Sequence, residues 1–361
     1  MAVALNATVG PAPEPVELTV APAAGSAGLP VTTELATTVR NGTVGEVRLV
    51  DAAGAAVAGA MRAHGSAWVP DLPLGYATAY TATVTATGGA GSTATPVTAT
   101  TTFTTMARPS GTRVGSGLYL SNGKTYGVAM PVVVEFESDV PVEARAAVQR
   151  RLFVRSDPPQ PGAWRWYGAR VILYRTPEFW KPGTTLTVRS ALEGLPIGKR
   201  FGDKDRSATV TIGRDLRVDI NNATKQLTVT QDGQVIRTMP VSLGKPSTPS
   251  SSGTTVIISK EASTIFDTTQ TDGARGYRIP VSYAQRLTWG GEYIHAAPWS
   301  VGDQGRRNVS HGCVNVSMGN ASWLFGVTMI GDPVTTRGTE RKLSAGNGWS
   351  AWDVPWAEFG A

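Results

Sequence analysis

Two short stretches decide the fold: Ile294-His295-Ala296-Ala297-Pro298-Trp299, and Ser310-His311-Gly312-Cys313-Val314-Asn315-Val316-Ser317. Together they hold two of the 3 histidines and the 1 cysteine of a chain of 361 residues. A single cysteine excludes an intrachain disulfide, so this thiol is either an inert core residue or a reactive one. The residues around it discriminate between these two possibilities.

The residue types around Cys313 fit acyl transfer. A thiol is mostly protonated at neutral pH, and a nearby imidazole can take its proton to generate the thiolate nucleophile. The imidazole in turn needs a third group to orient it. A glycine before the nucleophile lets the backbone approach closely, as an oxyanion hole of N–H groups requires. The pattern predicts Cys313 as the nucleophile, His295 as the base at the end of a strand, and Gly312 beside the oxyanion.

Two other interpretations of these residues are disfavoured. Two histidines and a cysteine could ligate zinc, but no carboxylate or second cysteine lies at ligand spacing in the sequence. An inert core thiol prefers apolar neighbours, whereas Cys313 lies among His311, Gly312 and Asn315. We therefore predict no metal and no cofactor.

Outside the motif, the composition predicts a mostly β protein. Charged residues make up 17% and hydrophobic residues 41%, with 41 Gly and 24 Pro, which favours strands and turns over coiled coil or disorder. Residues 1–106 and 107–213 both show short alternating strands separated by turn residues, the pattern of an Ig-like sandwich. We predict two tandem Ig-like β-sandwiches, the second interrupted by an amphipathic helix at 142–152.

A third, β-rich domain is predicted at 214–336, with hairpin strands around the turn Asp232-Gly233. A Trp-rich subdomain at 337–361 follows it. There, Trp349, Trp352 and Trp356 are spaced to share one face of a helix. We expect this tail to pack on the third domain, because so much aromatic surface would otherwise face water.

The net charge of +6 is concentrated in the segment 107–213, which has 16 Lys and Arg against 9 Asp and Glu. This segment either meets an anionic polymer or is simply a solvated face of the sandwich. Nucleic-acid binding is not expected, because no recognition motif accompanies the charge.

The two stretches resemble the signature of the L,D-transpeptidases, whose catalytic domain is YkuD-like: Ser-His-Gly-Cys-(Val/Leu)-Asn-(Val/Leu) after His-(Ser/Ala)-Ala-Pro-Trp. The resemblance covers most of the chain. Two Ig-like domains, a catalytic domain and a tail containing Trp352-Asp353-Val354-Pro355-Trp356 are similar to the mycobacterial and actinobacterial branch. Residues 130–134 and 179–183 are also similar to that branch.

The resemblance implies a role for each matching residue. Cys313 would be the nucleophile and His295 the base, with the imidazole oriented by the backbone carbonyl of Ala296, where many members have serine. The implied oxyanion residues are Gly312, His311 and Tyr277, and the implied substrate-binding residues are Tyr277, Trp299, Ser310, His311 and Asn315. For Tyr277 and Trp299, ordinary packing is the alternative. The segment 262–291 matches a lid over the donor pocket.

The reaction implied by the resemblance releases D-Ala from a peptidoglycan tetrapeptide stem. It then transfers the diaminopimelate acyl group to a side-chain amine of another stem, giving a 3→3 cross-link. Carbapenem β-lactams would acylate the same thiol. An L,D-carboxypeptidase, in which water resolves the acyl-enzyme, and a catalytically weak wall-binding protein remain as alternatives.

An enzyme of this kind acts outside the cytoplasm. No stretch approaches the roughly 20 apolar residues of a membrane helix, and Met1–Asn6 lacks the features of a signal peptide. We therefore expect an exported protein of the periplasm or cell wall, with its export signal or membrane anchor in a preceding segment absent from this sequence.

Overall fold

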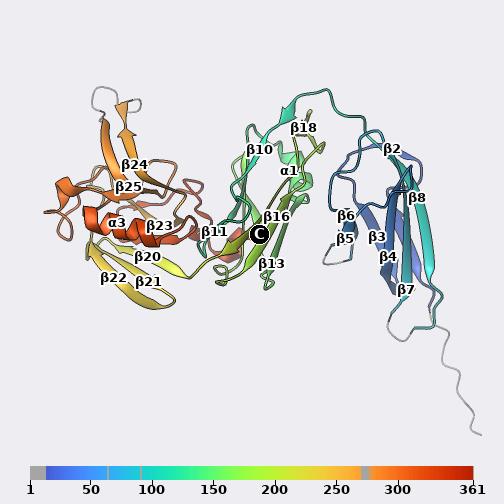
Figure 1. Ribbon diagram of the computed structural model, residues 1–361, viewed down its shortest axis with the longest axis horizontal. Helices are drawn as coiled ribbons and strands as arrows, with labels where there is room; N and C mark the ends of the chain where they lie inside the picture. The colour runs from blue at the N-terminus through green and yellow to red at the C-terminus, as the bar shows by residue number, and fades with distance from the viewer. Residues whose placement is uncertain (1–13, 63–64, 90–91, 270–275, 277, 361) are drawn as a thin grey trace, which may run out of the picture. The chain divides into compact units, whose positions relative to one another are not determined.

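The computed structural model describes residues 14–62, 65–89, 92–269, 276 and 278–360. The chain divides into two compact units, which are described separately. The first holds the residues up to Gly115 together with Glu143–Arg151 and Ala191–Asp205, and the second holds the remaining residues through the C-terminal tail. Strands dominate the regular structure (Figure 1), which confirms the predicted mostly β fold.

The first unit contains a β-sandwich. Its two four-stranded sheets have the orders β1-β3-β6-β5 and β2-β8-β7-β4. Their strands are β1 (Glu17–Ala21), β2 (Ser26–Leu29), β3 (Leu35–Arg40), β4 (Gly42–Asp51), β5 (Gly59–Met61), β6 (Ala67–Pro70), β7 (Ala79–Gly88) and β8 (Val97–Thr105). Leu35 and Trp68 from one sheet pack with Leu49, Tyr80 and Phe103 from the other.

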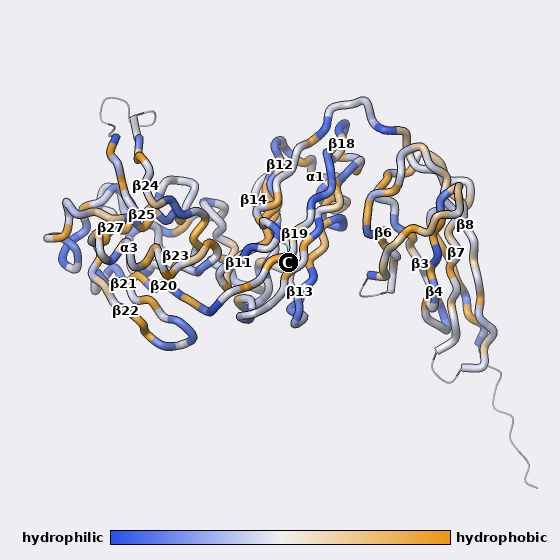
Figure 2. Tube along the Cα trace, in the orientation of Figure 1, coloured by the Kyte–Doolittle hydropathy of each residue, from blue (hydrophilic) through white to orange (hydrophobic). Residues whose placement is uncertain are grey.

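Strand β7 shows why this sequence forms a sandwich. Tyr80, Ala82, Val84 and Ala86 are buried, and the residues between them are more exposed. A period of two places one side of a strand in the core and the other towards water. Figure 2 shows the same rapid change of hydropathy from residue to residue along many strands.

The first unit also holds a small three-stranded sheet and most of the helix α1. This sheet has the order β17-β18-β9, and the elements are β9 (Arg113–Val114), α1 (Val142–Gln149), β17 (Pro196–Ile197) and β18 (Arg200–Gly202). The helix predicted at 142–152 is confirmed but ends earlier, because strand β13 begins at Leu152.

The second unit begins with another sandwich, here called the second sandwich. Its sheets have the orders β10-β12-β15-β14 and β11-β19-β16-β13. Its strands are β10 (Ser116–Leu118), β11 (Thr125–Tyr126), β12 (Val132–Phe136), β13 (Leu152–Asp157), β14 (Ala163–Tyr167), β15 (Val171–Arg175), β16 (Thr185–Ser190) and β19 (Arg206–Ile212). Trp180 is buried in its core and donates a hydrogen bond from Nε1 to the carbonyl of Met130 at 2.8 Å.

The remaining sheets of the second unit carry the motif residues. A six-stranded sheet has the order β22-β21-β20-β28-β23-β29, and a four-stranded sheet has the order β24-β25-β26-β27. Their elements are β20 (Leu216–Asn221), β21 (Gln226–Gln231), β22 (Gln234–Pro240), β23 (Ser251–Val256), β24 (Ser259–Asp267), β25 (Arg278–Arg286), β26 (Tyr293–Ala296), β27 (Val314–Val316), β28 (Pro333–Arg337) and β29 (Arg341–Lys342), with the short helix η2 (Pro298–Ser300) and the helix α3 (Met318–Val327).

These two sheets share one core, which fixes the strands that bear the motif. Leu216 and Val218 of β20 pack with Ile294 of β26, Val316 of β27 and Leu324 of α3. Helix α3 begins directly after β27, where the Ser317 hydroxyl accepts the N–H of Asn320 at 3.3 Å and caps the helix. The predicted hairpin turn is confirmed: Asp232 and Gly233 have φ of 50° and 82° between β21 and β22.

The C-terminal tail differs from the predicted single helix. It forms two short helices, η3 (Ala351–Asp353) and α4 (Trp356–Phe359), separated by Val354 with extended backbone. The prediction that Trp349, Trp352 and Trp356 share one face of a helix is therefore wrong, because Val354 and Pro355 separate the two short helices.

The tail packs on the second sandwich as well as on the six-stranded sheet. Arg175 donates to the carbonyls of Ala351 and Val354, and the Trp352 indole donates to the carbonyl of Ala129. The Asp353 carboxylate accepts the N–H of Thr254 in β23. The third domain was the predicted partner of the tail; the additional contact with the second sandwich depends on the buried Arg175, which no local sequence pattern identifies. Within the described ranges, no helix has the length and apolar character needed to span a membrane.

Candidate active site

Two hydrogen-bonded strands bring the base and the nucleophile together. Strand β26 pairs in parallel with β27, with His295 opposite Asn315. Cys313 directly precedes β27, so it lies beside the strand that carries His295. Both side chains line one cavity of about 370 Å³. Two larger cavities of the second unit, of about 540 and 600 Å³, contain neither residue.

The imidazole of His295 is oriented by its own neighbour. Its Nδ1 lies 2.9 Å from the carbonyl oxygen of Ala296. A carbonyl can only accept, so Nδ1 carries the hydrogen and Nε2 has a free lone pair. Burial lowers the pKa of His295 below 6.5, and the hydrogen bond to Ala296 opposes that change only in part. The ring is therefore neutral at neutral pH and able to accept a proton.

The thiol of Cys313 is held in its protonated form at rest. Burial raises the pKa of Cys313 to about 12; the N–H of Tyr293 acts in the opposite direction, and the negative charge of Glu292 raises the pKa further. The Sγ atom lies 3.6 Å from the carbonyl oxygen of Gly291. The resting site therefore pairs a neutral thiol with a neutral imidazole, and the proton leaves when a substrate is attacked.

The backbone before the nucleophile has a shape that favours glycine. Gly312 has φ of 129°, a region that side chains rarely adopt. Its N–H donates to the Ser310 hydroxyl at 3.1 Å, and its carbonyl accepts from the Ser250 hydroxyl at 2.7 Å. Because the N–H of Gly312 is engaged by Ser310, this glycine contributes to the site through its backbone conformation.

The other predicted residues surround the same cavity. The Ser310 hydroxyl also donates to the carbonyl of Cys313 at 2.6 Å, which closes a tight turn around Gly312. Asn315 is buried and donates from Nδ2 to the Ser300 hydroxyl at 3.1 Å. The ring of Trp299 is 57% exposed with its centroid 6.0 Å from that of His295, so its face is available to a ligand.

His311 is exposed and its Nε2 lies 3.1 Å from the ammonium of Lys245. An ammonium can only donate, so Nε2 of His311 accepts. This contact places the ammonium of Lys245 beside His311, which lines the cavity. Lys245 was not among the predicted site residues, because it is 68 positions from Cys313 and has no motif of its own.

The predicted lid corresponds to the long hairpin of β24 and β25, which projects from the sheet in Figure 1. Tyr277 and Gly273 lie outside the described residues. Phe266 of β24 packs against Tyr293 and His295, with ring centroids 4.6 and 5.1 Å apart, and lines the cavity with Ile279. Phe266 was not among the predicted site residues, although an aromatic residue in a predicted lid is a usable signal.

Comparisons with known proteins identify the family. A profile of the L,D-transpeptidase catalytic domain (YkuD) matches residues 215–335, and a bacterial Ig domain profile matches residues 26–196. The chain is 32% identical over 351 residues to L,D-transpeptidase 2 of Mycobacterium tuberculosis (strain CDC 1551 / Oshkosh), covering 96% of this chain and 84% of that protein.

Solved structures agree as well. The structure of the LD transpeptidase LdtMt1 in complex with imipenem has a TM-score of 0.52 and 34% identity, covering 61% of this chain and 97% of that one. L,D-transpeptidase 3 of Mycobacterium tuberculosis in complex with a faropenem-derived adduct has a TM-score of 0.51 and 30% identity, covering 62% and 97%. The chain described here therefore belongs to the L,D-transpeptidase family, with Ig-like structure preceding a YkuD catalytic domain.

Proposed function

We propose that this transpeptidase acts on peptidoglycan stem peptides through a thioester formed on Cys313, with His295 as general base. The observation that carries the proposal is the pairing of β26 with β27. It places an imidazole fixed by the Ala296 carbonyl, at 2.9 Å, and the thiol of Cys313 in one cavity. Nucleophile, base and orienting group are the three parts that such chemistry requires.

In the first half-reaction, Nε2 of His295 accepts the thiol proton as Sγ attacks the carbonyl between diaminopimelate and D-Ala. As the resemblance implies, the oxyanion lies beside the backbone of His311 and Gly312 and near the hydroxyl of Tyr277, with the conformation of Gly312 shaping that backbone. His295 then donates its proton to the leaving amine, and D-Ala departs. Burial disfavours both the protonated imidazole and the thiolate, so proton transfer is coupled to substrate attack.

In the second half-reaction, the side-chain amine of another diaminopimelate attacks the thioester. His295 takes a proton from this amine and returns it to Sγ, so the enzyme is regenerated. The exposed face of Trp299 and the side chains of Phe266 and Ile279 keep the thioester in a partly apolar cavity. Exclusion of water there favours the amine over hydrolysis.

Covalent inhibition by carbapenem-class β-lactams is part of the same proposal. Relatives of this fold are known in complex with imipenem and with a faropenem-derived adduct. Attack of Cys313 on the β-lactam carbonyl would resemble the first half-reaction, except that the amine released from the broken ring bond stays attached to the acyl group. The acyl-enzyme would then persist, because the opened lactam stays attached and blocks the cavity.

We also propose a division into 1–106, 107–213, 214–336 and 337–361, with the Ig-like parts as a stalk for an exported catalytic domain. A separate core within residues 1–106 and the catalytic profile match at 215–335 support this division, whereas the core of the second sandwich also takes in Val256, Ile258 and the tail residue Trp349. Extracellular peptidoglycan as the substrate supports the periplasm or cell wall as the compartment.

The test is mass spectrometry of the intact protein and of its products. With imipenem, the wild-type protein should gain the mass of one inhibitor, and Cys313→Ala should gain none. With a disaccharide-tetrapeptide, the wild type should release D-Ala and give a cross-linked dimer. Thr228→Ala, a change on an exposed strand face far from the motif, is the control and should behave as wild type.

Each product identifies one alternative. A free tripeptide without dimer would replace transpeptidation by L,D-carboxypeptidase activity. D-Ala release by Cys313→Ala at the wild-type rate would refute the proposed nucleophile. Absence of both the adduct and D-Ala release in the wild type would favour a wall-binding protein.

A further inference from the structure

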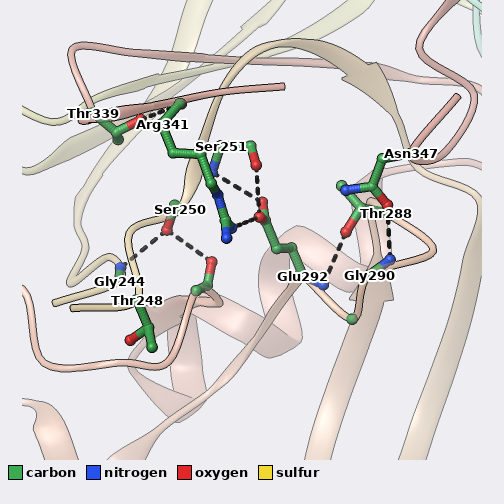
Figure 3. Close-up of polar contacts among 12 residues, drawn as sticks. Gly244, Thr248, Ser250, Ser251, Thr288, Gly290, Glu292, Thr339, Arg341 and Asn347 are labelled. Atoms are coloured by element: carbon green, nitrogen blue, oxygen red, sulfur yellow. Dashed lines mark hydrogen bonds and ion pairs between the residues drawn. The ribbon is translucent and has the colours of Figure 1, made fainter. Parts of the chain in front are cut away.

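An ion pair between the buried Glu292 and the half-exposed Arg341 packs against the residue before the nucleophile. Glu292, in the turn between β25 and β26, is 7% exposed, and its carboxylate accepts from Nη2 of Arg341 on β29. It also accepts from the main-chain N–H of Ser251 at 3.1 Å and from the Ser251 hydroxyl at 2.8 Å. Figure 3 shows these groups converging on one carboxylate. None of them belongs to the proposed catalytic set.

The network reaches the backbone of the nucleophile in two ways. A Cβ on Gly312 would lie 3.7 Å from Cγ of Glu292 and 3.8 Å from Nη2 of Arg341, so both side chains pack against Gly312. Ser250 lies next to Ser251, which donates to Glu292. The Ser250 hydroxyl donates to the Gly312 carbonyl and accepts from the N–H of Gly244. Glu292 therefore fixes Ser251 at the start of β23, and the neighbouring Ser250 binds the carbonyl of Gly312, the residue before Cys313.

The network also changes the charge near the thiol. Glu292 is the residue between Gly291, whose carbonyl contacts Sγ, and Tyr293, whose N–H favours the thiolate. The negative charge of Glu292 opposes ionisation of Cys313, and the guanidinium paired with Glu292 carries the opposite charge. The other titratable or charged side chains around the thiol are His295, His311, Tyr293, Lys245 through His311, and Asp303 at the cavity wall.

We propose that Glu292 is a positioning residue for the nucleophile and that Arg341 is its balancing cation: the pair fixes the Gly312–Cys313 backbone from behind and keeps a buried negative charge from suppressing thiolate formation. The inference rests on the proposed role of Cys313 as nucleophile. Its test reads the thiol itself, independently of transpeptidation.

The experiment measures alkylation of the full-length protein by iodoacetamide between pH 5 and 10, with imipenem acylation measured in parallel. The single cysteine makes each adduct unique in the intact mass. The variants are Glu292→Gln, Arg341→Gln and the double change. Arg337→Gln is the control, because that arginine forms an exposed pair with Asp219 on β28 and β20.

The expected result is two shifts of opposite sign. Glu292→Gln leaves a cation near the thiol, so alkylation at pH 7 should be roughly threefold to tenfold faster, with the profile moved to lower pH. Arg341→Gln should slow it by a similar factor and move the profile upward. The double variant should have a profile closer to wild type than either single variant, and Arg337→Gln should match wild type.

Loss of imipenem acylation in Glu292→Gln despite faster alkylation would support the positioning role, because it separates backbone alignment from thiol ionisation. Circular dichroism and melting curves identify variants that fail to fold, and the double variant retains a neutral amide pair in the same space. Unchanged pH profiles in both folded single variants, with wild-type acylation, would overturn the proposal. Shifts in the same direction in both would overturn the balancing role of Arg341. Failure of wild-type acylation with normal alkylation would instead refute the proposed function.

Discussion

Replacing Arg175 by methionine should release the C-terminal tail from the second sandwich. The Arg175 side chain is buried and donates to the tail carbonyls of Ala351 at 3.0 Å and Val354 at 2.6 Å. Its guanidinium also lies 4.8 Å from the ring centroid of Trp352 and 4.5 Å from that of Phe359. Methionine keeps the apolar stem but offers no donor to these carbonyls.

The magnitude follows from the lost partners. A buried acceptor left without a donor costs about 1–3 kcal/mol, and two tail carbonyls lose theirs. Loss of the ring contacts adds about 1 kcal/mol. Relief of the guanidinium's desolvation, which lowers its pKa in the folded protein, offsets part of this cost. We expect the second unit to be destabilised by about 3 kcal/mol.

The assay is urea unfolding followed by tryptophan fluorescence, with native-state hydrogen exchange of the amides from Leu343 to Gly360. A chain of two compact units need not unfold in one step, so exchange identifies the segment that opens. The control is Arg217→Met, whose side chain is 51% exposed beside Asp215 and lies over the ring of Phe179. It should cost at most about 1 kcal/mol. An equal effect of the two substitutions, or unchanged tail exchange in Arg175→Met, would refute the reasoning.

Three further predictions concern the site. Gly312→Ala must place a Cβ at φ of 129°, which costs about 1–3 kcal/mol; imipenem acylation should fall at least tenfold, and a wild-type rate would contradict the need for glycine. Ala296→Ser keeps the main-chain carbonyl that orients His295, so acylation should stay within about threefold of wild type, whereas a large loss would show that the side chain matters. The folded-state pKa of His295 lies below its unfolded value of 6.5, so the unfolded chain binds a proton that the folded chain does not, and stability should fall as pH drops below about 6.5. His295→Gln should lack this pH-dependent loss of stability in urea titrations at pH 5 and 7. An identical pH dependence in both proteins would contradict the prediction.

The fold class and the main pair of the site could be predicted from sequence because both are local signals. Alternation in β7 and the turn at Asp232-Gly233 are read within a few residues. The spacing of His295 and Cys313 is explained by β26 and β27 being neighbours in one sheet. Recognition of the motif then supplied the orienting role of the Ala296 carbonyl.

The contacts that complete the site come from distant parts of the chain. Lys245, Ser250 and Arg341 reach the nucleophile segment from positions before and after it, and only the tertiary fold brings them together. The predicted single helix of the tail is wrong, because the helical spacing of its tryptophans does not require one continuous helix. Arg175 and Pro355 instead hold two short turns on the sandwich. No local pattern identifies which buried cation a segment will meet.

The interleaving of the two compact units along the chain has a consequence for synthesis. The first unit takes in Glu143–Arg151 and Ala191–Asp205, so its last segment follows Gly115 by about 90 residues. At a translation rate of about 5–20 residues per second, that interval lasts roughly 5–18 s. In the described part of the chain, strands β1 to β8 pair with one another, so their two sheets can form before these later segments of the same unit are made. The residues around Cys313 are made after both segments but before Arg341 and the C-terminal tail, so the site is completed late in synthesis.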